Sequence, residues 1–434
     1  MFVLLSKYSS AQWQSFDNNS SVQVYKLYYD SSVDTLFAIG KFIDSSGIQY
    51  EGLCKWDNSN WIEVGNIHFN NYPPKSICRF QGSIYIGGNF SLQSGFPGNY
   101  ILKFNGVGWD SLPSSPNGEV HDLAVFQNQL WVIGFFTFIG NNYTDHLSQF
   151  DGLQWTYFST LLQLYSRGTL YADSSKIYFG GQWAGFQTDS FSNLFCWNGN
   201  AFESVGSGLP NANVIYTINS FNNKLIIGGD FSHFQNPGEN IVSWNNSSFN
   251  DLIGGTNGRV YCTSNDSDHL FIGGEFTSVG NINASKIAQW NGARWCADSS
   301  SINGTVYNMV FYHDDLVICG LFTNINSQPF NHLAKFHAPN FSSTCSFSNG
   351  IEQANYSSFN FNIYTNTFTN ELIVELDNNK FKSIKIMDLF GIIQDEYYSQ
   401  SDKISISTQN YVAGIYFCYV SCDNNKFMRK FIIN

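Results

Sequence analysis

The sequence is organised around one repeated pattern. An apolar run ends in a glycine, and a large aromatic residue follows two positions later; the glycines recur at intervals of 45 to 48 residues. They are Gly40, Gly88, Gly134, Gly181, Gly229, Gly274 and Gly320. Such regular self-similarity indicates a repeat architecture in which each copy is one supersecondary unit that cannot bury its apolar faces alone.

Each copy predicts four short strands. The second is a continuous apolar run, as at residues 84–86 (IYI), which is typical of a strand buried on both faces. The third ends before a turn such as Asn105-Gly106 or Asn291-Gly292, and an aromatic residue opens the fourth. Four-stranded antiparallel units of this length, covered on both faces, pack radially as a β-propeller.

The two ends of the repeat region complement each other. Six copies carry the fourth-strand aromatic residue, such as Trp61 or Trp295, whereas the seventh copy lacks this strand. Trp13 precedes Trp61 by one repeat length. We therefore expect an all-β chain in which residues 12–340 form a seven-bladed β-propeller, closed by an N-terminal strand around Trp13.

The remaining segments have other compositions. Residues 1–11 read either as a truncated signal peptide or as a disordered tail. Residues 341–358 are rich in Ser, Asn and Phe and are interpreted as a linker. Residues 359–434 contain five runs typical of strands, several with alternating polarity, which predicts a small immunoglobulin-like β-sandwich.

Both regions resemble known families. The repeat is similar to the Gly-Gly-X-Phe…Trp-Asn-Gly-X-X-Trp repeats of secreted bacterial propellers and, loosely, to kelch repeats. The tail resembles the C-terminal sorting domain of the type IX secretion system of Bacteroidetes, through residues 384–391 (IKIMDLFG), 404–406 (ISI) and 414–417 (GIYF). Residues 364–367 (YTNT) depart from the Tyr-Pro-Asn-Pro with which that family usually opens. The resemblance implies the type IX machinery as a partner and a secreted or outer-membrane surface location.

Composition and motifs exclude several functions. A net charge of -12 argues against nucleic acid as a partner, and no apolar run is long enough for a transmembrane helix. The sequence has no Gly-X-Ser-X-Gly elbow, no His-Glu-X-X-His and no phosphate loop. Residues 44–47 (DSSG) do not provide the full set of oxygen ligands that a calcium site requires. We expect a binding protein without cofactor, metal or catalytic residues; the alternative is an enzyme acting on polysaccharide or peptide.

The second-to-third loop of each copy differs from the others, and variable loops on a rigid scaffold commonly carry binding. These loops contain aromatic residues suited to binding an extracellular glycan or protein. The alternative is that they are ordinary solvated loops in which a few aromatic rings pack against the protein. The candidate ligand-binding residues are Tyr50, Phe96, Tyr100, Tyr143, Phe186, Phe191, Phe234 and Phe330.

Three further sets of residues stand out. Aromatic rings recur in the innermost strands, where they either pack a central channel or line a small-ligand funnel; they are Tyr25, His121, Tyr216, Tyr261 and Tyr307. Asp230 and Glu275 occupy a position where other copies have Lys, Phe or Leu, so a structural role is expected. Among nine cysteines, Cys418 and Cys422 flank a short turn and could pair in an oxidising compartment.

Overall fold

The structure is a computed structural model. It describes residues 13–16, 21–44, 46–70, 72–92, 99–159, 163–165, 167–184, 193–209, 212–231, 239–280, 282–297, 300–337, 361–366, 371–376, 382–388, 392–399, 401, 403–422 and 425–433. All regular elements in these ranges are strands. The chain divides into two compact units, Met1–Ser346 and Phe347–Asn434. The expected signal segment 1–11 and linker 341–358 lie outside the described residues.

Within the described residues, the first unit contains seven larger antiparallel sheets, and in six of them the strands lie side by side in chain order. These six are β2 (Ser21–Asp30), β3 (Thr35–Ile43), β4 (Gln49–Trp56) and β5 (Trp61–Asn70); β6 (Pro74–Phe80), β7 (Ser83–Gly88), β9 (Ile101–Phe104) and β10 (Trp109–Asp110); β11 (Val120–Phe126), β12 (Gln129–Gly134), β15 (Leu147–Phe150) and β16 (Trp155–Tyr157); β18 (Thr169–Ala172), β19 (Ile177–Gly180), β21 (Leu194–Trp197) and β22 (Phe202–Ser204); β23 (Ala212–Phe221), β24 (Lys224–Phe231), β25 (Ile241–Trp244) and β26 (Phe249–Asp251); and β27 (Val260–Asn265), β28 (Leu270–Gly274), β31 (Ile287–Trp290) and β32 (Trp295–Cys296).

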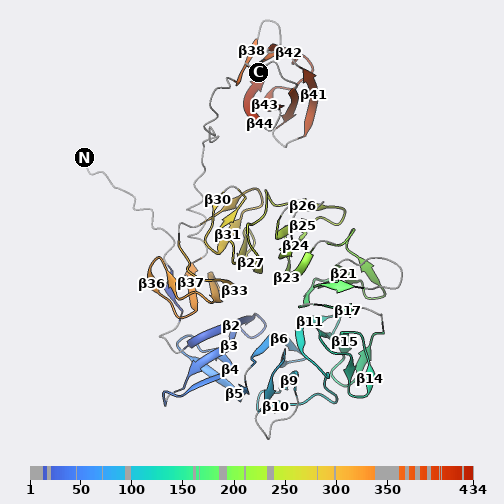
Figure 1. The fold of residues 1–434 in the computed structure, drawn as a ribbon, viewed down its shortest axis with the longest axis vertical. Coiled ribbons are helices and arrows are strands. Elements are labelled where there is room, and N and C mark those ends of the chain that lie inside the picture. The colour runs from blue at the N-terminus through green and yellow to red at the C-terminus, as the bar shows by residue number, and fades with distance from the viewer. Residues whose placement is uncertain are drawn as a thin grey trace, which may run out of the picture. The chain divides into compact units, whose positions relative to one another are not determined.

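The seventh sheet joins both ends of the first unit. It contains β33 (Val306–Tyr312), β34 (Asp315–Gly320), β37 (Leu333–His337) and β1 (Gln14–Ser15), in the order β1-β37-β34-β33. Trp13 beside β1 donates its indole N–H to Ser300 Oγ at 2.9 Å, and its ring lies 4.6 Å from that of Phe336. Figure 1 shows the seven sheets around a common centre with the first strand of each sheet innermost.

Shorter strands lie in the loops of the first unit. They are β8 (Ser91–Leu92), which pairs with β5, and the pairs β13 (Phe138–Ile139) with β14 (Asn142–Tyr143), β17 (Gln163–Leu164) with β20 (Trp183–Ala184), β29 (Ser278–Val279) with β30 (Ile282–Asn283), and β35 (Asn324–Ile325) with β36 (Gln328–Pro329). Isolated bridges such as Pro116–Ile139 and Thr256–Val279 join a sheet-to-sheet connection to the second-to-third loop of the next sheet. Both kinds of loop therefore occupy one end of the sheets, called the loop end below.

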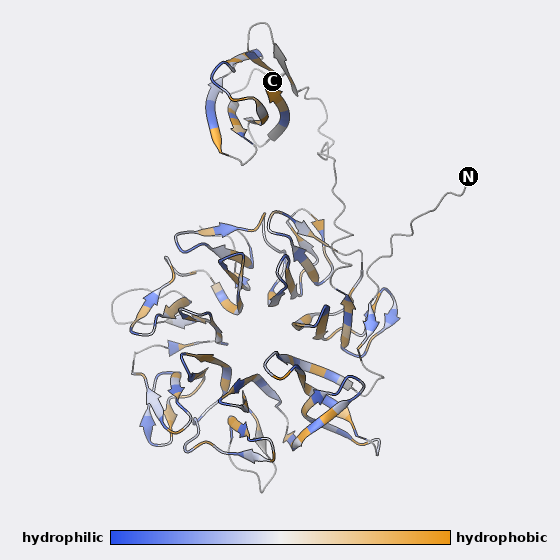
Figure 2. Ribbon diagram, turned by 180° about the vertical axis from the view of Figure 1, so that it is seen from behind, coloured by the Kyte–Doolittle hydropathy of each residue, from blue (hydrophilic) through white to orange (hydrophobic). Residues whose placement is uncertain are grey.

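The repeated residues are packing residues. The aromatic residue after each glycine is buried; the set is Phe42, Phe90, Phe136, Trp183, Phe231, Phe276 and Phe322. Each core cluster combines neighbouring sheets, as where Phe136 and Leu123 of the third sheet share a cluster with Tyr85 of the second. Figure 2 shows much hydrophobic colour along the sheet strands and more hydrophilic colour on several outer hairpins. Burial of these rings is a main source of stability.

The glycine of the repeat is required by a close approach of two strands. A Cβ added to Gly274 would lie 2.0 Å from the carbonyl oxygen of Arg259, which no relaxation of a side chain can relieve. Opposite this glycine the strand register shifts between Val260 and Cys262, so that Tyr261 is a bulged residue without a ladder partner. The same shift occurs opposite Gly40, Gly88, Gly134, Gly229 and Gly320.

The third-to-fourth turns differ in detail from the expected two-residue hairpin. In Asn105-Gly106 only the glycine has positive φ, at 98°, while Asn105 Oδ1 accepts the backbone N–H groups of Val107 and Gly108. The side chain therefore stabilises a four-residue loop as an Asx turn. Asp57 and Asn245 make the same contacts in the two copies without glycine, where an asparagine, as at Asn58 with φ 75°, takes the left-handed place.

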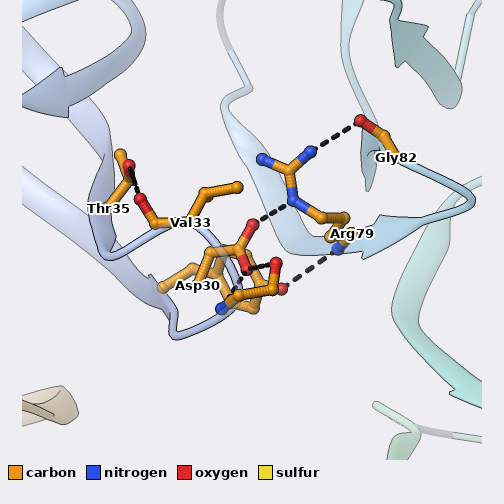
Figure 3. Close-up of polar contacts among 7 residues, drawn as sticks. Asp30, Val33, Thr35, Arg79 and Gly82 are labelled. Atoms are coloured by element: carbon orange, nitrogen blue, oxygen red, sulfur yellow. Dashed lines mark hydrogen bonds and ion pairs between the residues drawn. The ribbon is translucent and has the colours of Figure 1, made fainter.

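An ion pair joins the first two sheets away from the loop end. Arg79 on β6 donates through Nε to Asp30 Oδ2 and through Nη1 to the carbonyl oxygen of Gly82, at 2.6 Å (Figure 3). Asp30 is buried and also caps its own turn by accepting from Ser32 N and Oγ. The Arg79 backbone N–H donates to Tyr28 OH at 3.1 Å, and burial raises the pKa of Tyr28 to about 12.

The second unit contains two antiparallel sheets. One has the order β38 (Phe361–Asn366), β39 (Glu371–Leu376), β42 (Lys403–Ser407), and the other has the order β41 (Ile393–Ser399), β40 (Lys382–Asp388), β43 (Gly414–Cys422), β44 (Asn425–Ile433). Both contribute to one core that includes Val374 and Ile386. The five runs expected from the sequence correspond to β39, β40, β42, β43 and β44, whereas β38 and β41 were not expected. Each pairs with a single neighbouring strand, and β41 has only exposed and half-buried residues, so the apolar alternation of a half-buried strand is absent there.

The cysteines require one correction. Cys418 is a free, buried thiol, so it does not form the bond with Cys422 that the sequence left open. Its side chain belongs to the core of the second unit, and burial raises the pKa of the thiol to about 12. Cys54 and Cys196 are also free and buried, as expected for small apolar residues. Cys296 takes part in a disulfide.

Candidate binding site

The first strands enclose a central cavity of about 710 Å³. Pairs of consecutive residues from one strand line it, such as Tyr25 and Lys26 of β2 and Tyr216 and Thr217 of β23. In a regular strand, neighbouring side chains point to opposite faces. The register shift described above relieves this constraint and explains why both members of each pair reach the cavity.

Tyrosine rings form part of the cavity wall where the first strands begin, next to the loop end. The ring centroids of Tyr216 and Tyr261 lie 4.8 Å apart, and those of Tyr261 and Tyr307 lie 5.3 Å apart. Burial, followed by the nearby carboxylate of Glu51, raises the pKa of Tyr25 above its usual range. Burial also raises the pKa of Tyr216 and of Tyr261, so Tyr25, Tyr216 and Tyr261 are neutral hydrogen-bonding groups at physiological pH.

His121 stands at the tyrosine position of the third sheet but does not line the cavity. It is 2% exposed, its ring makes an edge contact with Phe135 at 4.3 Å, and Nδ1 accepts the backbone N–H of Gly168 at 3.1 Å. Burial, assisted by the nearby cations Lys75 and Arg167, lowers the pKa of His121 to about 3. The imidazole is therefore neutral and serves as an acceptor between two sheets.

The residue after the bulge forms contacts between successive first strands. Asp122 Oδ2 accepts from Leu170 N at 2.9 Å and from Thr169 Oγ1 at 3.2 Å, both on β18. Its Oδ1 accepts from Ser76 Oγ on β6 at 2.7 Å and from Leu123 N at 3.0 Å. Asp122 thus binds donors on three sheets.

The equivalent residue in the seventh sheet bridges to the first sheet. Asn308 Oδ1 accepts from Leu27 N at 2.8 Å, which connects β33 with β2. Lys26 occupies the same position in β2, but an ammonium group can only donate and cannot take over this acceptor role. The sequence did not identify Lys26 or Asp122 as a cavity residue. Regular alternation along the first strand would turn these side chains away from the cavity, and only the bulge brings them to it.

Carboxylates at the rim are paired with an arginine. Arg259 Nε lies 2.9 Å from Asp230 Oδ2, and its Nη1 lies 3.2 Å from Glu275 Oε1. Tyr261 OH donates to Glu275 Oε2 at 3.2 Å. These contacts give Asp230 and Glu275 a structural role, as the sequence indicated. No group of three or more His, Cys, Asp and Glu residues is placed to hold a metal ion in the parts of the chain described here.

Four of the eight predicted ligand-binding aromatics, Phe96, Phe186, Phe191 and Phe234, lie outside the described residues. Tyr143 is half exposed and makes an edge contact with Phe138 across the β13–β14 hairpin, with centroids 5.5 Å apart. Phe330 is buried at 8% exposure in the core of the seventh sheet, so its ring offers little surface to a ligand.

The other two predicted aromatics are half buried. Tyr50 stacks on His68 at 5.1 Å and contacts Cys54 Sγ through its hydroxyl at 3.2 Å. Tyr100 packs against the core between the second and third sheets and has a left-handed backbone, with φ 69°. Its carbonyl accepts the N–H of Gly88, a contact that His146, Asn193, Asn240, Lys286 and His332 repeat in other sheets. The position of Tyr100 is therefore a structural one.

Exposed aromatic rings gather at the loop end. Among the described residues of the first unit, the exposed large aromatic residues are Tyr72, Phe135, Phe138, Tyr143, Tyr165 and Tyr307. Each lies in a sheet-to-sheet connection, in a second-to-third loop or at the start of a first strand. Within the described part of the first unit, the large apolar residues exposed at the opposite end are aliphatic, such as Val107 and Leu153 in the third-to-fourth turns.

Comparisons with known proteins identify the C-terminal region. Residues 362–434 match the family model of the secretion system C-terminal sorting domain. This domain marks the chain as secreted or displayed at the outer-membrane surface, and it implies an interaction with the type IX secretion machinery. No curated protein matches the sequence. No helix in the described residues has the length and hydropathy required to cross a membrane.

Several solved structures are similar at low identity. One is PorZ, an essential bacterial surface component of the type IX secretion system of Porphyromonas gingivalis, with 13% identity and a TM-score of 0.48; the match covers 97% of this chain and 60% of PorZ. Two others are extracellular domains of B. thetaiotaomicron proteins, the putative one component system BT4673 and the putative hybrid two component system BT3049. Both have 11% identity and a TM-score of 0.30; the matches cover 98% of this chain and 59% of BT4673, and 94% of this chain and 72% of BT3049.

Proposed function

We propose that residues 12–340 form a seven-bladed β-propeller, closed by strand β1, that binds an extracellular glycan or protein at its loop end and is not an enzyme. The observation that carries the proposal is that the exposed aromatic rings of the described first-unit residues gather at that end, whereas the large apolar side chains exposed at the opposite end are aliphatic. Aromatic rings supply large rigid contact surfaces to sugars and proteins. The pairing of β1 with β37 supports the closed ring.

The state of the carboxylates favours binding over catalysis. Hydrolysis of a glycosidic bond requires two carboxyl groups that are free to exchange protons or to attack the sugar. In the cavity, Asp122 accepts hydrogen bonds from four donors, and at the rim Asp230 and Glu275 are held by Arg259. The oxygens of these carboxylates already accept hydrogen bonds or form ion pairs that join sheets. They are therefore poorly suited to act as general acids or bases.

The aromatic hairpin provides the test. Replacing Phe138 and Tyr143 together by alanine in the full-length chain should lower retention on a glycan array or a cell-surface preparation at least tenfold, without changing the melting temperature. The matched control replaces Val107 and Leu153, which are 92% and 79% exposed at the opposite end. Equal loss of binding in both double variants, or no loss in either, would contradict binding through the loop end.

The export route has a separate test. Deletion of residues 359–434 should leave the protein in the periplasm, because the secretion machinery recognises its substrates through the sorting domain. The experiment compares surface and periplasmic fractions of cells producing the full-length and shortened chains. Normal surface display of the shortened chain would reject this assignment.

A further inference from the structure

We propose that the central cavity is a second binding site, distinct from the β13–β14 hairpin of the loop end, and that it takes a small acidic sugar of the hexuronate class. Lys26 and Arg167 would hold the carboxylate, and the tyrosines Tyr216, Tyr261 and Tyr307 would stack on the sugar ring. The proposal rests on two cations that form no ion pair with any residue the structure describes, on the size of the cavity and on the mixed chemistry of its wall.

Lys26 is a mostly enclosed cation that faces the cavity. Across the described residues, neither an ion pair nor a hydrogen bond is formed by its ammonium group. Burial lowers the pKa of Lys26, the positive charge of Arg167 acts in the same direction, and the carboxylate of Asp122 opposes both. A charge in such a place is costly without a counter-ion, which an anionic ligand would supply.

Asp122 is the carboxylate that could act as the counter-ion of Lys26, but both of its oxygens already accept hydrogen bonds. Both of them accept from donors on the second, third and fourth sheets. Lys75 also lines the cavity, and its charge is balanced by the ion pair with Glu119. Among the described residues that line the cavity, Lys26 and Arg167 are therefore the cations without a paired carboxylate, in a chain whose net charge is -12.

The rest of the wall fits a hydroxylated ring. The contiguous tyrosine rings offer flat apolar faces, and the hydroxyl groups of Thr217 and Thr263, 3.0 Å apart, offer both donors and acceptors. A volume of about 710 Å³ lies within the range of small-molecule sites, roughly 300–1,000 Å³, and accommodates one or two sugar units. A simple inorganic anion would leave most of this wall without a contact.

The test is calorimetric titration of the full-length protein with glucuronate and galacturonate, with glucose as the neutral comparator. We expect a hexuronate to bind about tenfold to a hundredfold more tightly than glucose, the gain typical of charge-assisted hydrogen bonds. Lys26→Met should abolish this preference and keep or raise the melting temperature, because it removes an uncompensated buried charge. Lys55→Met, at an exposed lysine on β4, is the matched control and should change neither property.

Arg167→Gln provides a second variant that does not alter the interior. It should weaken uronate binding about tenfold and leave glucose binding unchanged. Equal affinity for uronates and glucose in the wild-type protein, or an unchanged preference in both variants, would overturn the proposal. The double variant at Phe138 and Tyr143 should bind uronate normally, so a failure of this site and a failure of the loop-end site are distinguishable.

Discussion

Asp122 offers a quantitative test of how the sheets are joined. Asp122→Asn keeps one carbonyl oxygen, so the contacts with Ser76 and Leu123 can survive, but the new NH2 group would face the N–H of Leu170. The buried Leu170 N–H then loses its acceptor at 2.9 Å, and Thr169 loses its acceptor at 3.2 Å. At about 1.5–3 kcal/mol for a hydrogen bond to a charged group, and with the Thr169 hydroxyl free to turn elsewhere, we expect a loss of about 2–4 kcal/mol in the free energy of unfolding.

The assay is equilibrium denaturation of the full-length protein by urea, followed by tryptophan fluorescence. Thr217→Ala is the matched control because Thr217 holds the same repeat position in the fifth sheet and makes one neutral hydrogen bond, to Thr263. It should cost about 1 kcal/mol. If Asp122→Asn costs less than Thr217→Ala, the carboxylate does not join the sheets as described.

Further predictions concern pH and two packing positions. His121→Asn keeps an acceptor but removes the depressed pKa of about 3; the unfolded chain binds the extra proton below a pKa of about 6.5, so wild type should lose up to about 1.4 kcal/mol more stability per pH unit than the variant between these values, in urea titrations at several pH values. Parallel slopes would contradict this. Gly274→Ala should prevent folding or cost more than about 3 kcal/mol, whereas Gly106→Ala, at an open position with φ 98°, should cost about 1–2 kcal/mol in the same assay. Trp13→Ala should cost about 3–5 kcal/mol, and the exposed neighbour Gln14→Ala less than about 0.5; similar values for both would show that Trp13 is not a core residue.

The packing residues were predictable because every sheet meets its neighbour in the same way. In six of the seven sheets a glycine lies opposite a bulge, and in all seven a buried ring follows two residues later, so Gly274 and Phe276 have counterparts at intervals of 45 to 48 residues. Because the same packing requirement recurs in each repeat, the same residue types recur at regular intervals in the sequence. The turns at Asn58 and Asn246 left no such trace, because asparagine replaces glycine at the left-handed position.

The candidate site was predictable only in part. Tyr143 is an exposed loop-end ring, and the innermost tyrosines were placed at a channel, but Tyr100 and Phe330 are tied to the core. Lys26 could not be foreseen, since its orientation follows from a one-residue register shift that sequence periodicity does not reveal. Strand β41 escaped notice for a related reason: an exposed edge strand lacks the apolar pattern of a half-buried one.

The bulge at the start of the first strands has an evolutionary consequence. The bulged residue has no partner in the ladder, so exchanging it costs no hydrogen bond of the ladder and displaces no strand. Different copies already carry tyrosine and lysine there, as at Tyr25 and Lys75, both of which line the cavity. After a repeat is duplicated, each copy can therefore change its own contribution to the cavity independently, and a chain with this scaffold can acquire a new ligand by single substitutions while its fold is preserved.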